Sequence, residues 1–302
     1  MIEFSCLNNF CPSTLEAQKN SFTVVCAYTF HYYERCFTTS THVYNKDKNL
    51  KKKKSIGVSK LGVDMKAYTL NEIQETTIER ITTGFKYLDI IYGKSEKGRE
   101  VKFGLPLGMI SLWAGAPGVG KTRISTDISI TVSNQGYKVL LFQNEVTMSQ
   151  YKGWVKKEVK NKDKFLICSC STLKDQLTVI EREKPDLVIC DSVNMIEGYD
   201  NPKEIRVIME DYKLLAQRIN CHVIFIGHLN KENKVKGNND LEYLIDISCK
   251  LYNHDNIRGM FVFEIGKCRG GISGGFAVFK HVENGIEYVV GSEDERWKAH
   301  FK

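Results

Sequence analysis

The sequence predicts an α/β fold with a mostly parallel central sheet and an antiparallel edge. Between residues 108 and 290, short apolar runs typical of buried strands alternate with longer stretches typical of helices. The last strand-like runs follow one another without helices, so we expect them to pair antiparallel. The expected strands are 109–114, 138–143, 165–169, 186–191, 222–227, 247–252, 260–266, 275–281 and 286–290. The expected helices are 121–134, 147–159, 172–183, 203–219 and 239–245.

A glycine-rich loop follows the first of these strands. Its letters GAPGVGKT match G-x-x-x-x-G-K-[ST], with a strand before it and a helix after it. Glycines let successive backbone N–H groups cradle phosphate oxygens at a helix N-terminus, whereas a chance glycine turn would lack this context. Lys121 is expected to reach the outer phosphates of a nucleotide, and the Thr122 hydroxyl is expected to be a ligand for Mg²⁺. The expected nucleotide-binding residues are Gly115, Ala116, Pro117, Gly118, Val119, Gly120, Lys121, Thr122 and Arg123.

Three polar residues end other expected strands. Asp191 follows four apolar residues and is expected to help hold Mg²⁺, with helix capping as the alternative. Glu145 ends the strand after the loop's helix and is expected to act as the general base, unless it is an ordinary surface charge. His228 is a candidate sensor of the γ-phosphate, or else satisfies a backbone carbonyl.

Two further groups of cations are candidates. The polar segment after His228 carries lysines expected to bind the DNA backbone, although they are equally compatible with a solvated loop. These lysines are Lys231, Lys234 and Lys236. Lys267 and Arg269 precede a Gly-Gly pair and are expected to stabilise the transition state on a neighbouring subunit's nucleotide. An ordinary cationic hairpin tip is the alternative.

Length and composition indicate how the chain is divided into domains. The 302 residues are 42% hydrophobic, enough for one large domain and an appendage, and the net charge of +7 is compatible with nucleic-acid binding. Residues 1–64 differ from the rest and are expected to be an accessory module or an unstructured basic segment, with translation from Met65 as an alternative. Residues 65–302 are expected to form the ATPase domain.

The sequence also bears on the compartment. Six of the ten cysteines fall in the expected ATPase domain, several within apolar strand patterns, which favours buried thiols in a reducing compartment. The apolar run Phe22 to Phe30 is too short to span a bilayer, and no secretory signal pattern opens the chain. We therefore expect a cytoplasmic protein without a membrane partner.

With these residues in order, the chain resembles the RecA/DnaB class of oligomeric ATPases, and most closely its RadA/Sms branch. The letters RITTGFKYLD at 80–89 are similar to that branch's entry motif, and GHLNKE at 227–232 to its G-H-V-T-K-E. Lys267-Cys-Arg269 resembles the start of K-N-R-F-G, which in the family reaches across a subunit interface. The resemblance covers about Tyr68 to Val290.

The resemblance implies a RecA-like core that uses ATP and Mg²⁺. It implies a motor that binds single-stranded DNA in recombination or repair, by branch migration or DNA remodelling. It also implies a homo-oligomer, as a hexameric ring or filament, with a recombinase as a further candidate partner. A DnaB-like replicative helicase and a non-motor oligomeric ATP switch are the alternatives.

The chain departs from the family pattern in several places. The family's zinc finger and C-terminal protease-like domain are expected to be absent, which puts zinc binding in doubt. Asn239 stands where the family has an arginine, and Gly270 where it has an aromatic residue.

Overall fold

The structure is a computed structural model that describes residues 17–18, 21–22, 67, 69–72, 77–93, 102–229, 241–254, 257–271 and 273–292. The chain divides into two compact units, Met1–Ile73 and Gln74–Lys302. The division expected from the sequence lies nearby, between residues 64 and 65. In the first unit, strands β1 (Ala17–Gln18) and β2 (Ser21–Phe22) pair antiparallel, and Leu70–Glu72 forms a short 3-10 helix. The other residues of the 1–64 segment lie outside the described residues.

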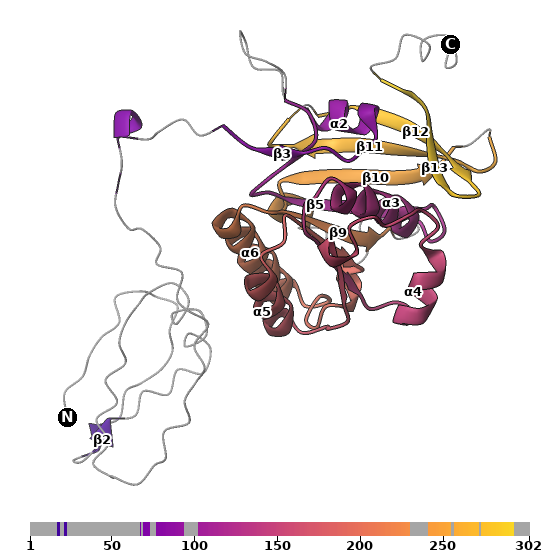
Figure 1. The fold of residues 1–302 in the computed structure, drawn as a ribbon. Coiled ribbons are helices and arrows are strands. Elements are labelled where there is room, and N and C mark those ends of the chain that lie inside the picture. Colours follow the sequence, from indigo (N-terminus) through magenta and orange to yellow (C-terminus); the bar gives the residue numbers. More distant parts are fainter. Residues whose placement is uncertain are drawn as a thin grey trace. The chain divides into compact units, whose positions relative to one another are not determined.

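The second unit is an α/β domain around a nine-stranded sheet (Figure 1). The strand order is β13-β12-β11-β10-β5-β9-β8-β6-β7. The strands are β5 (Ile110–Gly115), β6 (Val139–Gln143), β7 (Phe165–Cys168), β8 (Leu187–Asp191), β9 (His222–His228), β10 (Ile247–Asn253), β11 (Met260–Cys268), β12 (Phe276–Val282) and β13 (Gly285–Gly291). Strands β5 to β10 pair in parallel with their sheet neighbours, and β10 to β13 pair antiparallel. The predicted fold class is therefore confirmed.

Helices cover both faces of this sheet (Figure 1). They are α2 (Lys86–Tyr92), α3 (Lys121–Asn134), α4 (Met148–Trp154), α5 (Leu173–Glu183), α6 (Pro202–Ile219) and α7 (Leu241–Leu244). Apolar residues of α2 and α3 pack on one face with Trp113 and Leu141, while those of α5 and α6 pack on the other with Leu112 and Leu140. Successive residues of a strand thus pack into the cores on opposite faces of the sheet, because their side chains alternate between the two faces.

Two differences from the sequence-based expectation concern helices. Helix α2 was not expected. It lies in the chain between the two-residue strands β3 (Arg80–Ile81) and β4 (Leu105–Pro106), which pair antiparallel with each other. Helix α4 ends at Trp154 instead of continuing to 159, because Val155 is in an extended conformation. Gly153 and the β-branched Val155 are weak helix formers, which accounts for the early end.

The described cysteines 168, 170, 190, 221, 249 and 268 are free thiols. Among the described helices, none has the length and apolar character needed to cross a bilayer.

Candidate functional site

The phosphate-binding loop joins β5 to α3. Gly120, immediately before the helix, has a φ of 109°. A Cβ at this position would lie 2.5 Å from His281 Cε1, so glycine is required both by backbone conformation and by space. The Lys121 amine donates hydrogen bonds to the carbonyl oxygens of Gly115 (2.7 Å) and Ala116 (2.9 Å). These bonds hold the ammonium group over the loop in which phosphates bind.

Four neighbouring strands end at this loop. In the sheet, β9 lies beside β5, then come β8 and β6. His228 ends β9, Asp191 ends β8, and Glu145 follows β6 by two residues. These side chains, with Lys121 and Thr122, line one cavity of about 560 Å³. The structure therefore brings together the residues that the sequence placed at separate strand ends.

Asp191 is a buried carboxylate at the strand end. Burial raises its pKa to about 6, whereas a hydrogen bond from the Thr122 hydroxyl acts in the opposite direction. The Gln143 amide lies 3.5 Å from its Oδ2 atom. A hydroxyl and a carboxylate in contact beside a phosphate-binding loop form the donor set that suits Mg²⁺.

Among the described residues, no group of three or more His, Cys, Asp or Glu side chains could hold a metal ion. Mg²⁺ is usually bound by one or two protein ligands, with waters and phosphate oxygens completing its shell, and the Thr122 hydroxyl beside the Asp191 carboxylate supplies such a pair. The residues present thus fit Mg²⁺.

Glu145 is held in place from both sides. The Gln143 side chain accepts a hydrogen bond from the Glu145 backbone N–H at 2.8 Å. Two residues after Glu145, Thr147 caps the start of α4 in a capping box with Gln150. The His228 Nε2 atom lies 3.1 Å from Glu145 Oε1. Burial of Glu145 acts to raise its pKa. Hydrogen bonds, including one from His228, and the positive charge of Lys121 outweigh this effect and leave the pKa below its usual value. The carboxylate is therefore ionised at neutral pH.

Some cavity residues carried no clear signal in the sequence. Trp154, at the end of α4, lines the cavity with 51% of its surface exposed. His281 also lines it, from β12 at the far antiparallel part of the sheet, and packs 5.0 Å from the Phe261 ring. An exposed tryptophan on a helix end was a usable signal for Trp154. Only the folded sheet reveals His281.

Arg123 lines the same cavity, but its guanidinium also has other partners. It donates hydrogen bonds to the carbonyl oxygens of Val282 (2.5 Å) and Glu283 (2.8 Å). The side chain thereby ties the start of α3 to the turn between β12 and β13.

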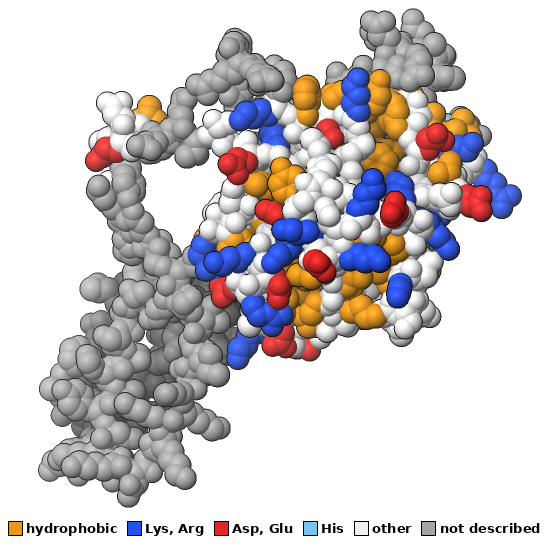
Figure 2. All heavy atoms as spheres, in the orientation of Figure 1, with side chains coloured by type: hydrophobic (Ala, Val, Ile, Leu, Met, Phe, Trp, Pro, Cys, Tyr) orange, Lys and Arg blue, Asp and Glu red, His pale blue; other side chains and the backbone are white. Residues whose placement is uncertain are grey.

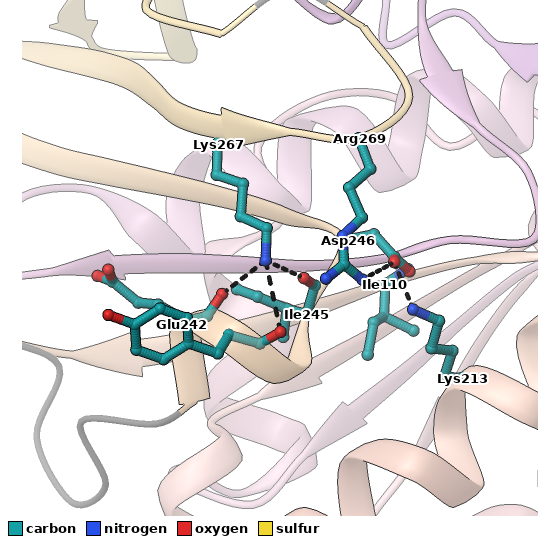
Figure 3. A network of polar contacts seen from close by, with 8 residues as sticks. Ile110, Lys213, Glu242, Ile245, Asp246, Lys267 and Arg269 are labelled. Atoms are coloured by element: carbon teal, nitrogen blue, oxygen red, sulfur yellow. Dashed lines mark hydrogen bonds and ion pairs between the residues drawn. The ribbon is translucent and has the colours of Figure 1, made fainter.

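Lys267 and Arg269 lie away from this cavity. Cys268 pairs with Ile247, and Ile247 pairs with Ser111 near the start of β5. The loop lies at the other end of β5, four residues from Ser111 and so about 13 Å along the strand at about 3.3 Å per residue. Lys267 donates to the carbonyl oxygens of Glu242 (3.0 Å) and Ile245 (2.8 Å) instead (Figure 3).

The turn after Arg269 is closely packed. A Cβ on Gly271 would lie 2.5 Å from the Tyr92 carbonyl oxygen, and one on Gly270 would lie 2.7 Å from Met109 Sδ. Glycine at 271 is thus a packing requirement in this chain, because its close neighbours are backbone oxygens, whereas the flexible Met109 side chain beside Gly270 can move. The candidate DNA-binding lysines Lys231, Lys234 and Lys236 lie outside the described residues.

Three kinds of comparison bear on this domain. The family model described as "AAA domain" matches residues 101–234. The DNA repair protein RadA of Aquifex aeolicus (strain VF5) is 29% identical over 217 residues, which is 70% of this chain and 46% of that protein. RadA of Mycolicibacterium smegmatis is 25% identical over 207 residues, 65% of this chain and 44% of that protein. The chain thus spans less than half the length of these relatives.

The fold comparison agrees. The crystal structure of the RadB recombinase matches with a TM-score of 0.54 at 21% identity, covering 70% of this chain and 100% of that one. The predicted resemblance to RadA/RecA-like ATPases and the RecA-like fold are both confirmed.

Proposed function

We propose that this RadA/RecA-like domain hydrolyses ATP and uses the energy to act on single-stranded DNA in recombination or repair. The observation that carries the proposal is the convergence of Lys121, Thr122, Asp191, Glu145 and His228 on one cavity beside the phosphate-binding loop. These residues supply a cation for phosphates, a metal-binding pair and a positioned carboxylate. This is the set that phosphoryl transfer to water requires.

Each residue then has a role in hydrolysis. Lys121 neutralises charge on the outer phosphates, and the backbone N–H groups of the loop orient them. Thr122 and Asp191 would hold Mg²⁺, which would offset the negative charge of the phosphates. Glu145 orients the attacking water and accepts its proton, and His228 holds the Glu145 carboxylate in position.

We further propose that the active form is an oligomer. Lys267 and Arg269 lie at the end of β5 opposite the loop, too far to serve the nucleotide of their own subunit. A head-to-tail ring or filament would bring that end of one subunit to the loop of the next. In such an assembly the two cations would stabilise transition-state charge on a neighbour's nucleotide.

The DNA contacts are proposed for the segment that follows His228. It carries Lys231, Lys234 and Lys236 and leaves the sheet directly beside the nucleotide cavity. On the face shown in Figure 2, Lys and Arg side chains of the described residues are dispersed among acidic and apolar ones, without a single large basic patch. The lysine-rich segment is therefore a better candidate for backbone contacts than this face.

The test is ATP turnover with and without single-stranded DNA, together with DNA affinity across a salt series. The variant with Lys231, Lys234 and Lys236 all changed to Ala should lose the stimulation and keep basal turnover. Its slope of log K against log salt should flatten by about 2, at roughly 0.7 per lost phosphate contact. The matched control changes Lys160, Lys162 and Lys164 to Ala, which are exposed lysines in another loop.

Each outcome discriminates between functions. Turnover that DNA does not stimulate would contradict the motor and favour an oligomeric ATP switch. Unwinding of a long duplex without a recombinase would favour a replicative helicase instead. An unchanged salt slope in the triple variant would move the DNA site elsewhere.

A further inference from the structure

The carboxylate of Asp246 accepts hydrogen bonds from three separate parts of the domain (Figure 3). Its Oδ2 atom accepts a hydrogen bond from the Ile110 N–H at 3.2 Å, at the start of β5. Its Oδ1 atom accepts from Lys213 Nζ on α6 at 2.6 Å and from Arg269 Nη1 at 3.1 Å. Two cations thus share one oxygen atom.

Asp246 itself is fixed. Its backbone N–H donates to the Ile110 carbonyl at 3.0 Å, and its carbonyl accepts from the Arg269 N–H at 3.0 Å. The Asp246 side chain is only 6% exposed. A carboxylate this buried is strongly destabilising if it loses every positive partner. One cation must therefore remain beside it.

The two cations differ in freedom. Lys213 is 28% exposed and projects from the eighteen-residue helix α6, whereas Arg269 is 49% exposed. The backbone after Arg269 is held, because Arg80 donates to the Gly270 carbonyl and Gly271 packs against Tyr92. The Arg269 side chain is thus the more exposed of the two cations and can leave the network while its backbone stays in place.

We propose that Asp246 is the resting dock of Arg269, and that Lys213 is the partner that keeps Asp246 paired when Arg269 turns to a neighbouring subunit's nucleotide. Lys213 is then a positioning residue that acts through Asp246 and touches neither nucleotide nor DNA. The shorter Lys213 bond already neutralises the carboxylate, so departure of Arg269 leaves no buried charge alone. This inference rests on the proposed trans role of Arg269.

The experiment measures kcat and KM for ATP in the assembled full-length chain. In Lys213→Met, Arg269 becomes the sole cation on Asp246, and its release becomes harder. We expect kcat to fall about tenfold, within the range of coupling energies for residues in one network, with KM unchanged. Adding Asp246→Asn to the same chain should restore kcat, because a neutral amide no longer retains Arg269.

Two controls accompany these variants. Lys203→Met removes an exposed lysine from the same helix and should leave kcat at the wild-type value. Lys213→Arg keeps the positive charge and should also keep kcat. Melting temperatures of all variants establish that each is folded.

The outcomes distinguish failure of the docking proposal for Asp246 from failure of the proposed trans role of Arg269. Three results would each overturn the docking proposal. They are a wild-type kcat in Lys213→Met, a lowered kcat in Lys213→Arg, and a double variant whose kcat is no higher than that of Lys213→Met. If the double variant does not fold, the contrast between Lys213→Arg and Lys213→Met decides. Normal turnover in Arg269→Ala would instead contradict the role of Arg269 itself.

Discussion

Glu145 and His228 meet across two strand ends, with His228 Nε2 3.1 Å from Glu145 Oε1, although 83 residues separate them in the chain. Glu145 follows β6 and His228 ends β9, with β8 between these strands in the sheet. The contact couples the carboxylate proposed as the base to the strand that leads into the proposed DNA-binding segment. A change in that segment therefore has a direct path to the reacting water.

The first prediction concerns Glu145. Glu145→Gln should retain ATP binding and lose turnover by roughly 10²-fold or more, because the amide cannot accept the proton of the attacking water. Steady-state turnover and an equilibrium binding titration measure the two effects separately. Near-normal turnover in this variant would show that the base lies elsewhere.

The second prediction concerns His228. His228→Ala removes the donor to Glu145 and should lower turnover about tenfold, the scale of one hydrogen bond to a charged group. His228→Gln can still donate a hydrogen bond and should recover part of this loss. Equal turnover in the two variants would contradict a positioning role for His228.

A third prediction uses Trp154 to follow nucleotide binding. Trp154 lines the cavity and is half exposed, so ATP should change its fluorescence. In Lys121→Ala the titration should shift to about tenfold higher ATP or more, because a charged hydrogen-bond donor to the phosphates is lost. Trp154→Phe is the control, and a full signal that persists in it would assign the change to another tryptophan.

The fourth prediction concerns the subunit interface. Lys121→Ala should not turn over ATP, because its own loop lacks the cation that contacts the phosphates. Arg269→Ala should not turn over ATP either, because each subunit lacks the cation that acts on its neighbour's nucleotide. Mixed in equal amounts, they should recover about one quarter of wild-type turnover, the share of random interfaces that pair an intact loop with an intact Arg269. No recovery at any ratio, with mixed assembly verified, would argue against the trans arrangement.

The fifth prediction concerns stability against pH through His222. This buried histidine lies 2.8 Å from Ser111 Oγ at one ring nitrogen and 2.7 Å from the Pro106 carbonyl oxygen at the other. Burial lowers its pKa from 6.5 to about 4. Between these values the unfolded chain binds a proton that the folded chain excludes, so this residue's contribution to stability falls as pH falls from about 6.5 to about 4. The loss amounts to about 3 kcal/mol at about 1.4 kcal/mol per pKa unit.

The measurement compares wild type with His222→Gln by denaturant unfolding from pH 7 to pH 4. Burial also raises the pKa values of Asp89 and Asp191 to about 6. The contribution of these two carboxyl groups to the free energy of unfolding therefore increases as pH falls. Since they titrate in both proteins, their effect cancels in the difference between the two. A difference in unfolding free energy that does not vary with pH would contradict the assignment to His222.

The sequence alone determined the local elements. The glycine loop and the helix from Lys121 to Asn134 agree with the structure, and so does the direct succession of strands from Ile247 onward. Turn chemistry, hydrophobic period and a phosphate-binding motif act over a few residues, so they can be recognised without the rest of the chain. The roles of Lys231, Lys234 and Lys236 stay predictions from sequence.

Tertiary structure decided what lies beside what. Sheet order inserts β9 between β5 and β8, and this places His228 against Glu145 and brings Asp191 to the same cavity. The same packing directs His281 toward the phosphate loop and docks Arg269 on Asp246 beside Lys213. The Glu145–His228, Lys213–Asp246 and Arg269–Asp246 contacts join residues 23 to 83 apart in the chain. Such long-range pairing is set by complementary burial of whole strands and helices rather than by local pattern.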